Sequence, residues 1–330
     1  MNRQYPPVDI LLATYNGARY LPTQLDSLLA QDYPSLRILA RDDGSSDETG
    51  ALLASYEART QGKLRVIEEG AATGGPKGNF AILMRHSAAP YVAFADQDDM
   101  WFPDKIRKTM RKVQRLERRV GADKPVLVFT NLTLADAELR PKGSTFWEDQ
   151  IIHPEACREL SRLLRQNVVT GCTMIANRAL VEHGCEMPQR VHMHDWWLAL
   201  LACSFGAIGY LREPTVLYRV HGNNACGLRE VYHGLPKLGA RRSRAGEWDA
   251  ILEQVQALYD AYGDRLSPRR RAMLAAVLRT SDRSTPWRNV YTILRHRVLH
   301  GEMRRNLALL MHFAVESRLG SSTSDLPRDA

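Results

Sequence analysis

The sequence predicts an α/β fold built around a mainly parallel sheet, and three observations support this prediction. Short apolar runs such as Val8–Thr14 end at turn residues and are followed by leucines at helical spacing, as at Leu21 and Leu25. Strand and helix patterns continue to alternate through the first half of the chain, which indicates βαβ units and parallel strands. The 330 residues are 44% hydrophobic and 25% charged, which excludes a mainly disordered chain.

Each expected strand in this part is a short apolar run, and helical patterns separate the runs. The expected strands are Val8–Thr14, Leu36–Ala40, Leu64–Ile67, Tyr91–Ala95 and Val126–Leu132. The expected helices between them begin near Leu21, Leu52, Asn79 and Ile106. The last of these helices carries an apolar stripe among basic side chains, so most of its surface is expected to be solvated.

The pattern loosens after residue 133. Residues 135–152 carry charges, Pro141 and Gly143, so we expect a loop over the edge of the sheet. Further expected elements are the helix Pro154–Gln166, the strand Thr173–Asn177, the helix His194–Phe205, and strands near residues 207–211 and 215–220. These elements complete a first domain, residues 1–228.

Residues 229–330 are expected to form a second, basic and mainly helical region. Helical stretches are expected at Trp248–Tyr262 and Val290–Leu319, and the polar run SSTSDLPRDA at the end is expected to be disordered. The region has 18 Lys/Arg and 11 Asp/Glu, so it holds +7 of the net charge of +8. Such a basic region suits an acidic partner, such as a membrane surface or a nucleic acid. The alternative is a helical cap whose apolar side packs on the first domain.

No segment of the sequence has the length and apolar character of a transmembrane helix. The longest apolar run, Trp196–Leu211, is interrupted by Ser204 and two glycines and stays below the ~18 residues that a span requires. Because no secretory signal is visible, we expect a cytoplasmic protein, with peripheral attachment to the inner face of the cytoplasmic membrane as an option. Five scattered cysteines without a C-x-x-C pair argue against a disulfide framework and a structural zinc site.

Polar side chains follow three of the expected strands. Thr14-Tyr15-Asn16 ends the first, Asp42-Asp43 the second and Asp96-Gln97-Asp98 the fourth. Ligands of an open parallel sheet bind at the carboxyl ends of its strands. Carboxylates gathered there would repel an anionic ligand unless a cation lay between them, and Mg²⁺ and Mn²⁺ prefer oxygen ligands. A D-x-D at a strand end therefore suits a metal-bridged nucleoside diphosphate, although ordinary turns contain such pairs too.

Four matches in order resemble the family 2 glycosyltransferases, which have the GT-A fold. VDILLATYNGARYLPTQLDSLLAQ followed by LRILARDDGSSDET resembles the nucleotide-binding start of that family. FADQDDMWFPDKI resembles its D-x-D region, in the D-Q-D-D-x-W form common in bacterial rhamnosyltransferase-like members. MHDWWLALLA resembles the segment with the catalytic base, and YRVHGNN the closing motif. The matches cover about residues 8–226, so the resemblance implies a GT-A domain there, and the helical C-terminal extension is expected from the residue pattern alone.

The resemblance also implies roles for single residues. Those that would bind the nucleotide-sugar are Thr14, Tyr15, Asp42, Asp96 and Gln97. Asp42 would accept a hydrogen bond from the ring N–H of a uracil or thymine. The metal, Mg²⁺ or Mn²⁺, would be bound directly by Asp98, with Asp96 and His221 as further contacts. Asp195 would be the general base that takes the proton of the acceptor hydroxyl.

Simpler structural roles compete with several of these assignments. Asp195 begins an apolar helix, where a carboxylate is also a favourable cap. Asp43 and Asp47 are typical of turns and caps. His192 and His194 have no third partner for a metal, so they are interpreted as loop residues.

The expected function is an inverting, metal-dependent glycosyltransferase. The resemblance implies L-rhamnose from dTDP-L-rhamnose as the donor, and a glycan or lipid-linked saccharide as the acceptor in the synthesis of a cell-surface polysaccharide such as O-antigen. A nucleotidyltransferase is one alternative, but it would have a Gly/Arg/Lys-rich loop where this chain has TYNGARYLP. The other is a non-catalytic protein that binds a nucleotide-sugar or a nucleic acid. An RNA-binding protein would present aromatics among its basic residues, so no nucleic-acid partner is expected.

Overall fold

The computed structural model describes residues 5–222 and 244–319, which form two compact units. The first unit comprises Met1–Arg158, Val168–Met187 and Met193–Tyr232. The second comprises Glu159–Asn167, Pro188–His192 and His233–Ala330. The domain division expected at 228/229, Cys226 and the polar end 321–330 lie outside the described residues.

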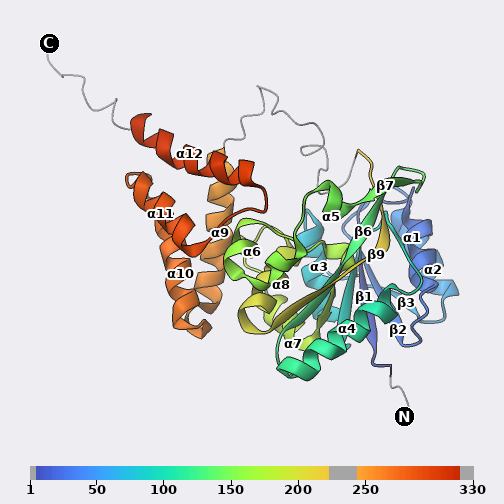
Figure 1. Cartoon of the computed structure of the whole chain (residues 1–330). Helices are drawn as coiled ribbons and strands as arrows, with labels where there is room; N and C mark the ends of the chain where they lie inside the picture. The colour runs from blue at the N-terminus through green and yellow to red at the C-terminus, as the bar shows by residue number, and fades with distance from the viewer. Residues whose placement is uncertain (1–4, 223–243, 320–330) are drawn as a thin grey trace. The chain divides into compact units, whose positions relative to one another are not determined.

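The first unit is built on a nine-stranded sheet (Figure 1) with the order β3-β2-β1-β4-β8-β6-β9-β5 and β7 paired to β6. A parallel block is formed by β1 (Val8–Thr14), β2 (Leu36–Asp42), β3 (Leu64–Val66) and β4 (Tyr91–Ala95). The chain places β2 and β3 on one side of β1 and β4 on the other. The carboxyl ends of β1 and β4 therefore flank the point where the strand order reverses, which is where open α/β sheets bind ligands.

The remaining strands extend this block. They are β5 (Met100–Trp101), β6 (Val126–Ala135), β7 (Pro141–Thr145), β8 (Ile175–Asn177) and β9 (Ala207–Arg219). β8 runs antiparallel to both β4 and β6, whereas β9 runs parallel to β6. The short strands β5 and β7 are antiparallel to β9 and β6. Six of the nine described strands thus point the same way, so the expected mainly parallel sheet is confirmed.

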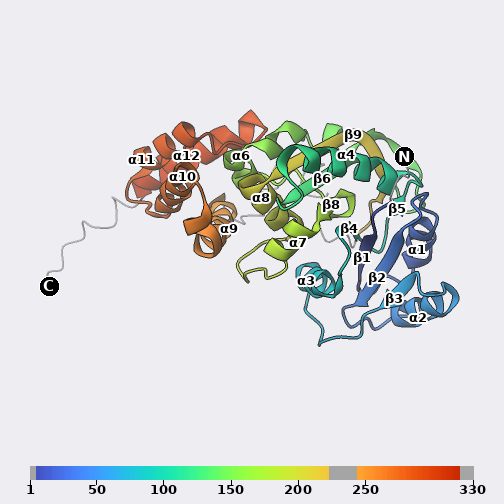
Figure 2. The same cartoon turned by 90° about the horizontal axis from the view of Figure 1, so that it is seen from below.

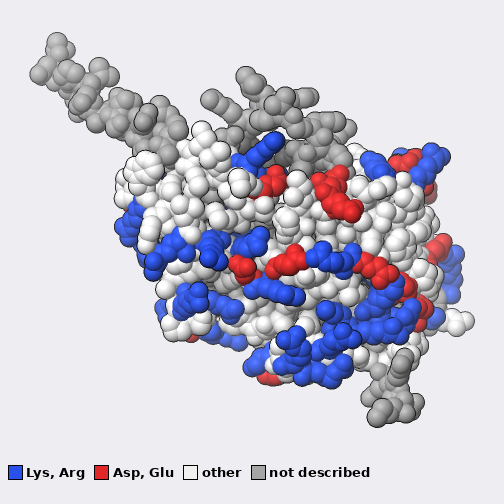
Figure 3. Space-filling view, viewed as in Figure 1, with Lys and Arg blue, Asp and Glu red and all other residues white. Residues whose placement is uncertain are grey.

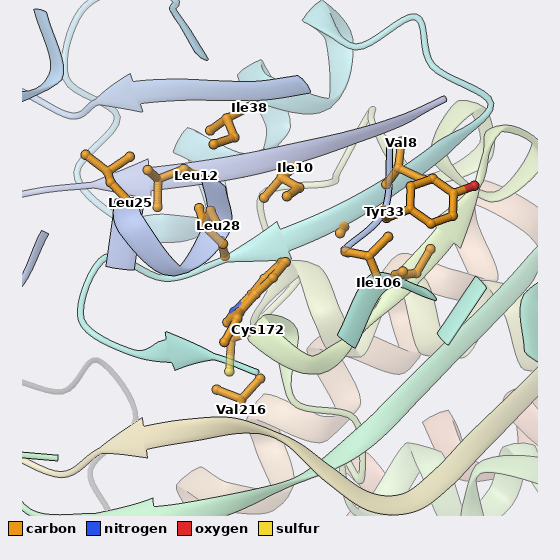
Figure 4. Close-up of a cluster of buried hydrophobic side chains, with 14 of the residues drawn as sticks. Val8, Ile10, Leu12, Leu25, Leu28, Tyr33, Ile38, Ile106, Cys172 and Val216 are labelled. Atoms are coloured by element: carbon orange, nitrogen blue, oxygen red, sulfur yellow. The ribbon is translucent and has the colours of Figure 1, made fainter. Parts of the chain in front are cut away.

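One face of the sheet is covered by α1 (Leu21–Leu29), α2 (Thr49–Arg59) and α4 (Lys105–Val120). Alternate residues of a strand share a face, and Ile10 and Leu12 of β1 point into this core. Leu25 and Leu28 of α1 meet them there (Figure 4). All four side chains are almost completely buried. The leucine spacing in the sequence therefore encodes the face of α1 that packs on the sheet.

The opposite face is covered by α3 (Pro76–His86) and α8 (His194–Phe205), and α7 (Arg178–Gly184) packs against α8. Figure 2 shows α3 and α1 on opposite sides of β1 and β2. Phe80 of α3 contacts Phe94 of β4 with ring centroids 5.5 Å apart. The α8 bounds coincide with those that the sequence predicts.

Three expected elements differ in the structure. Residues 135–152 are not a plain loop, because they contain β7 and α5 (Phe146–Asp149). The exposed residues of an edge strand lack an apolar pattern, which hides β7 in the sequence. Residues 207–219 form one strand rather than two, with register shifts against β6. The expected helix Pro154–Gln166 is split into a 3₁₀ turn, Pro154–Arg158, and α6 (Leu160–Arg165).

The second unit is helical among its described residues (Figure 1). It contains α6, α9 (Arg244–Tyr262), α10 (Pro268–Leu278), α11 (Pro286–His296) and α12 (Met303–Leu319). The single helix expected over Val290–Leu319 is two helices, because Arg297 adopts a left-handed conformation with φ 54° that ends α11. No helix in the described ranges has both the length and the apolar character needed to cross a membrane.

Candidate active site

The carboxyl ends of β1 and β2 are tied together by the two residues that end them. Thr14 Oγ1 donates a hydrogen bond to Asp42 Oδ1 at 2.9 Å. The other oxygen of Asp42, Oδ2, accepts from the backbone N–H of Ser45 at 2.8 Å, and Ser45 Oγ donates to Oδ1 at 2.6 Å. These bonds hold the Asp42 carboxylate at the carboxyl edge of the sheet, where the family resemblance implies a contact with a nucleobase.

Tyr15 and Gln97 are held against each other through the backbone of Tyr15. The Gln97 side chain accepts from the Tyr15 N–H at 2.8 Å and donates to the Tyr15 C=O at 2.9 Å. A Cβ at Gly17 would lie 2.2 Å from Gln97 Oε1, so only glycine leaves room for this pairing. Gln97 thereby fixes the turn after β1, in which Tyr15 is 58% exposed.

Asp43 is a buried anchor rather than a simple turn residue. Its carboxylate accepts from Arg41 Nη1 at 2.9 Å, from the Thr73 N–H at 2.7 Å and from the Gly75 N–H at 3.1 Å. Burial opposes ionisation, but the hydrogen bonds from Thr73, Arg41 and Gly75 outweigh it and lower the pKa of Asp43. Arg41 also donates to the backbone carbonyls of Glu69 and Ala71. This network holds the loop before α3 beside the ends of β1 and β2.

Asp98 and His221 meet although 123 residues separate them. Their Oδ2 and Nε2 atoms lie 2.8 Å apart. His221 packs against Tyr20 with ring centroids 4.8 Å apart and ring planes tilted by 38°, and the Arg219 guanidinium lies 4.4 Å from the centroid of the Tyr20 ring. Arg219 also donates from Nε to the Asp98 carbonyl at 2.8 Å. These contacts hold the end of β9 and the residues that follow it against the D-x-D segment.

The carboxylate of Asp96 lies near enough to those of Asp98 and Asp195 to interact electrostatically with both. Burial, with the charges of Asp98 and Asp195 close by, raises the pKa of Asp96 to about 7. Such crowding of carboxylates is costly for an empty anionic pocket and favourable for a bound cation. The structure thereby gathers at one edge the acidic residues that the sequence predicts for the site.

Asp195 lies in the first turn of α8, and its two carboxylate oxygens accept from backbone N–H groups. Oδ1 accepts from Trp196 at 2.6 Å and Oδ2 from Gly171 at 3.2 Å. The preceding residue, His194, is not a loop residue as expected. Its ring is buried between Phe80, with centroids 4.1 Å apart, and Phe94, with centroids 5.4 Å apart. Neither ring nitrogen of His194 has a hydrogen-bond partner in the described part of the chain.

Behind the D-x-D lies a second group of buried polar side chains. Ligand atoms of Asp96, Asp99 and Cys172 all lie within 4.8 Å of one another. Burial, together with Asp98 and Asp96, raises the pKa of Asp99 well above its usual range. Burial also raises the pKa of the Cys172 thiol and lowers the pKa of the Lys105 amine to about 7. Lys105 therefore does not belong to the solvated surface expected for α4.

The two groups of polar side chains differ in how well their ligand atoms suit a hard divalent cation. Mg²⁺ and Mn²⁺ favour carboxylate oxygens, and imidazole is a compatible ligand for transition metals. Asp96, Asp98 and His221 offer these donors. A thiol whose pKa is raised is a poor ligand for such an ion, so the group that includes Cys172 fits less well.

Sequence reasoning missed the residues that position the site: Arg41, Thr73, Gly171, Tyr20 and Arg219. One signal was present, since Arg219 and His221 are two apart at the end of an expected strand and so share a side. Arg41 likewise lies two residues from its partner Asp43. For Thr73, Gly171 and Tyr20 the partner lies far away in the sequence, and no local pattern marks the pair.

Comparison with known proteins identifies the family of the chain. A sequence model described as "Glycosyl transferase family 2" matches residues 9–180, just over half of the chain. The chain belongs to this family. The matched segment contains the strand ends of β1, β2 and β4, and so most of the polar residues gathered at the site.

Relatives in this family include proteins with more specific names. The dTDP-rhamnosyl transferase RfbG of Shigella flexneri is 26% identical over 230 residues, which cover 66% of this chain and 73% of the relative. The putative teichuronic acid biosynthesis glycosyltransferase TuaG of Bacillus subtilis is 27% identical over 231 residues, which cover 68% of this chain and 83% of the relative.

Solved structures show the fold. S. aureus TarS 1-349 in complex with UDP-GlcNAc matches with a TM-score of 0.54 at 14% identity, covering 95% of this chain and 92% of that one. A longer TarS structure matches with a TM-score of 0.56 at 14% identity over 95% of this chain, which spans 53% of that chain's length. The expected GT-A fold is confirmed by these likenesses and by the sheet topology.

Proposed function

We propose that this family 2 glycosyltransferase is an inverting, metal-dependent enzyme that transfers L-rhamnose from dTDP-L-rhamnose to a glycan or lipid-linked saccharide of the cell surface. The observation that carries the proposal is the contact between Asp98 and His221 at the reversal point of the sheet. It places the D-x-D segment beside the segment that resembles the closing motif, which supports Asp96, Asp98 and His221 as the proposed donor set. Asp96 also interacts electrostatically with Asp98 and Asp195.

Donor binding is assigned to the rim formed by the ends of β1, β2 and β4. Asp42 is fixed by Thr14 and Ser45, so its carboxylate is oriented before the nucleotide arrives. Tyr15 offers an exposed ring beside it for the base or ribose. Asp96, Asp98 and His221 would hold the cation. When bound, it would offset the negative charge that grows on the leaving diphosphate.

Asp195 is the proposed general base. Backbone N–H groups of Trp196 and Gly171 hold its carboxylate at the start of α8, where the helix dipole favours the ionised form. An ionised carboxylate within hydrogen-bond reach of the acceptor hydroxyl removes its proton as the oxygen attacks the sugar carbon. Attack from the face opposite the leaving group inverts that carbon. No protein acid is required in this scheme, because the bound metal would stabilise the leaving diphosphate.

The donor and acceptor in this proposal are supported by the names of relatives. RfbG is described as a dTDP-rhamnosyl transferase and TuaG as a teichuronic acid biosynthesis glycosyltransferase. The first name supports the donor, and the second supports a role in the synthesis of a polymer. The D-Q-D-D-x-W sequence at residues 96–101 is consistent with the same assignment.

Two isosteric variants separate binding from chemistry. We expect Asp98→Asn to lose Mn²⁺-dependent binding of dTDP in calorimetric titration, because the amide removes a charged ligand. We expect Asp195→Asn to bind dTDP with Mn²⁺ normally but to transfer sugar about 10²–10⁴-fold more slowly, the usual contribution of a general base. Transfer is followed by release of dTDP from dTDP-L-rhamnose in the presence of a cell-envelope glycan extract.

Asp123→Asn is the matched control. Asp123 lies just before β6, at the amino edge of the sheet, where it pairs with Lys124. It is expected to behave like the unmodified protein in both assays. Full transfer by Asp195→Asn would contradict the assignment of the base. Metal-dependent binding by Asp98→Asn would contradict the assignment of the metal ligand.

A further inference from the structure

Exposed apolar side chains are concentrated on two helices of the helical unit. Six of the nine large hydrophobic side chains that are exposed in the described residues belong to α11 and α12. They are Trp287, Tyr291, Leu294, Met303, Leu307 and Met311, and we call them the apolar stripe. Single exposed apolar residues are normal, whereas a cluster of this kind marks an interaction surface.

On each helix the stripe lies opposite the face that the unit buries. An α-helix turns about 100° per residue, so Trp287, Tyr291 and Leu294 fall within about 60° of one another. Ile293, which is completely buried, points to the other side of α11. The stripe residues of α12 lie opposite Leu309, which is 4% exposed. Because α11 and α12 pack against each other, both helices present an outer apolar side that their own core does not use.

Arginines accompany the stripe. Residues 286–311 contain five arginines and a single acidic residue, Glu302. Arg288, Arg295 and Arg304 are exposed. Figure 3 shows the region of α11 and α12 as a largely white area with blue side chains along its lower edge. Apolar side chains bordered by arginines are the chemistry of a helix that lies in the interface of an anionic membrane.

We infer that α11 and α12 form a surface that lies on an anionic phospholipid bilayer. The stripe inserts at the level of the headgroups, where the amphipathic rings of Trp287 and Tyr291 are well suited. The arginines contact lipid phosphates. A second copy of the chain fits less well, because a two-fold contact would bring the same arginines face to face. This inference concerns attachment and does not depend on the sugar-transfer reaction.

The first test is flotation of the full chain with vesicles of phosphatidylcholine, with or without phosphatidylglycerol. We expect binding to the anionic vesicles that weakens as salt is raised. The double variant Trp287→Ser/Leu307→Ser is expected to lower the partition coefficient on the order of tenfold or more, because two apolar side chains no longer insert. Arg288→Gln/Arg295→Gln is expected to lower it on the order of tenfold.

Matched controls separate this surface from overall charge and hydrophobicity. Arg118→Gln/Arg119→Gln removes the same charge from exposed positions of α4. Ile151→Ser removes an apolar side chain that is 52% exposed in the other unit. Both controls are expected to float like the unmodified protein.

A second measurement uses the tryptophans. Trp287 is the one exposed tryptophan of the six in the chain, all of which are described. Iodide should therefore quench mainly Trp287, and anionic vesicles should protect it. Trp287→Phe keeps an aromatic ring in the stripe, so it should still float with the vesicles while the protected signal disappears.

Three results would overturn the inference. They are a full chain that does not bind anionic vesicles at low salt, stripe and arginine variants that float like the controls, and iodide quenching that vesicles leave unchanged. A stripe variant that instead converts a dimer into a monomer in sedimentation would assign the surface to a second copy of the chain.

Discussion

At the scale of single residues, the surroundings of His194 disfavour its protonated form. Its imidazole lies between two phenylalanine rings beside the proposed base, with no hydrogen-bond partner on either nitrogen among the described residues. Burial lowers the pKa of His194 to about 3. In the unfolded chain the pKa of a histidine is about 6.5. Below about pH 6.5, His194 therefore binds a proton in the unfolded chain but stays neutral in the folded chain.

This difference predicts how stability changes with pH. Because the unfolded state binds more protons, the free energy of unfolding should fall by up to about 1.4 kcal/mol per unit as the pH drops from about 6 to 4. We expect His194→Phe to remove this component, so its advantage over the unmodified protein grows as the pH falls. Urea unfolding at pH 7, 6 and 5 measures the effect, and the exposed His192 provides the control His192→Gln. Parallel pH profiles for His194→Phe and the unmodified protein would contradict the prediction.

At the scale of elements, the start of α8 is fitted against the 3₁₀ turn Gly171–Thr173. A Cβ on Gly171 would lie 2.9 Å from His194 Nε2 and 3.7 Å from Asp195 Cβ. His194 has little room to move, because Phe80 and Phe94 hold its ring. The turn and the helix therefore approach closely only because residue 171 has no side chain.

Gly171→Ala should consequently shift the proposed base. A misplacement of about 1 Å can cost on the order of 10²-fold in rate, so we expect a fall in kcat of that order with dTDP binding retained. Gly50→Ala is the matched control, since nothing lies within 4 Å of a Cβ at that position in α2. It should leave activity unchanged and preserve or raise stability. An unchanged kcat in Gly171→Ala would mean that the turn does not position Asp195.

At the scale of the whole molecule, the two compact units are expected to unfold in separate steps. The proposed donor site lies wholly in the first unit. A nucleoside diphosphate should therefore stabilise the first unit alone, by about 2.7 kcal/mol at ~100 times its Kd. Scanning calorimetry should show that only one of two unfolding transitions moves to higher temperature. We expect dTDP to stabilise this unit only with Mn²⁺, and UDP, GDP and CDP to do so less. A stronger effect of UDP would keep the enzyme class and reject rhamnose, whereas no effect of any nucleotide would favour a non-catalytic protein.

Much of the fold follows from local pattern. The bounds of β1, β4 and α8 agree with the sequence prediction, because apolar alternation and helical spacing are decided by neighbouring residues. The strand ends of the site were predictable for the same reason, since parallel strands bring Thr14, Asp42 and Asp96 to one edge. β7 was not predictable, because its exposed residues on the edge of the sheet carry no apolar signal.

By itself, the sequence determined the parallel block, the polar edge and, through resemblance, the family of the chain. Only the tertiary structure decided that His221 contacts Asp98, that Asp43 is a buried anchor and that Gly171 supports Asp195. The physical reason is the distance along the chain. A helix or strand pattern is set by residues a few positions apart, whereas these contacts join residues 24 to 123 positions apart and exist only once the sheet and its helices have closed around them.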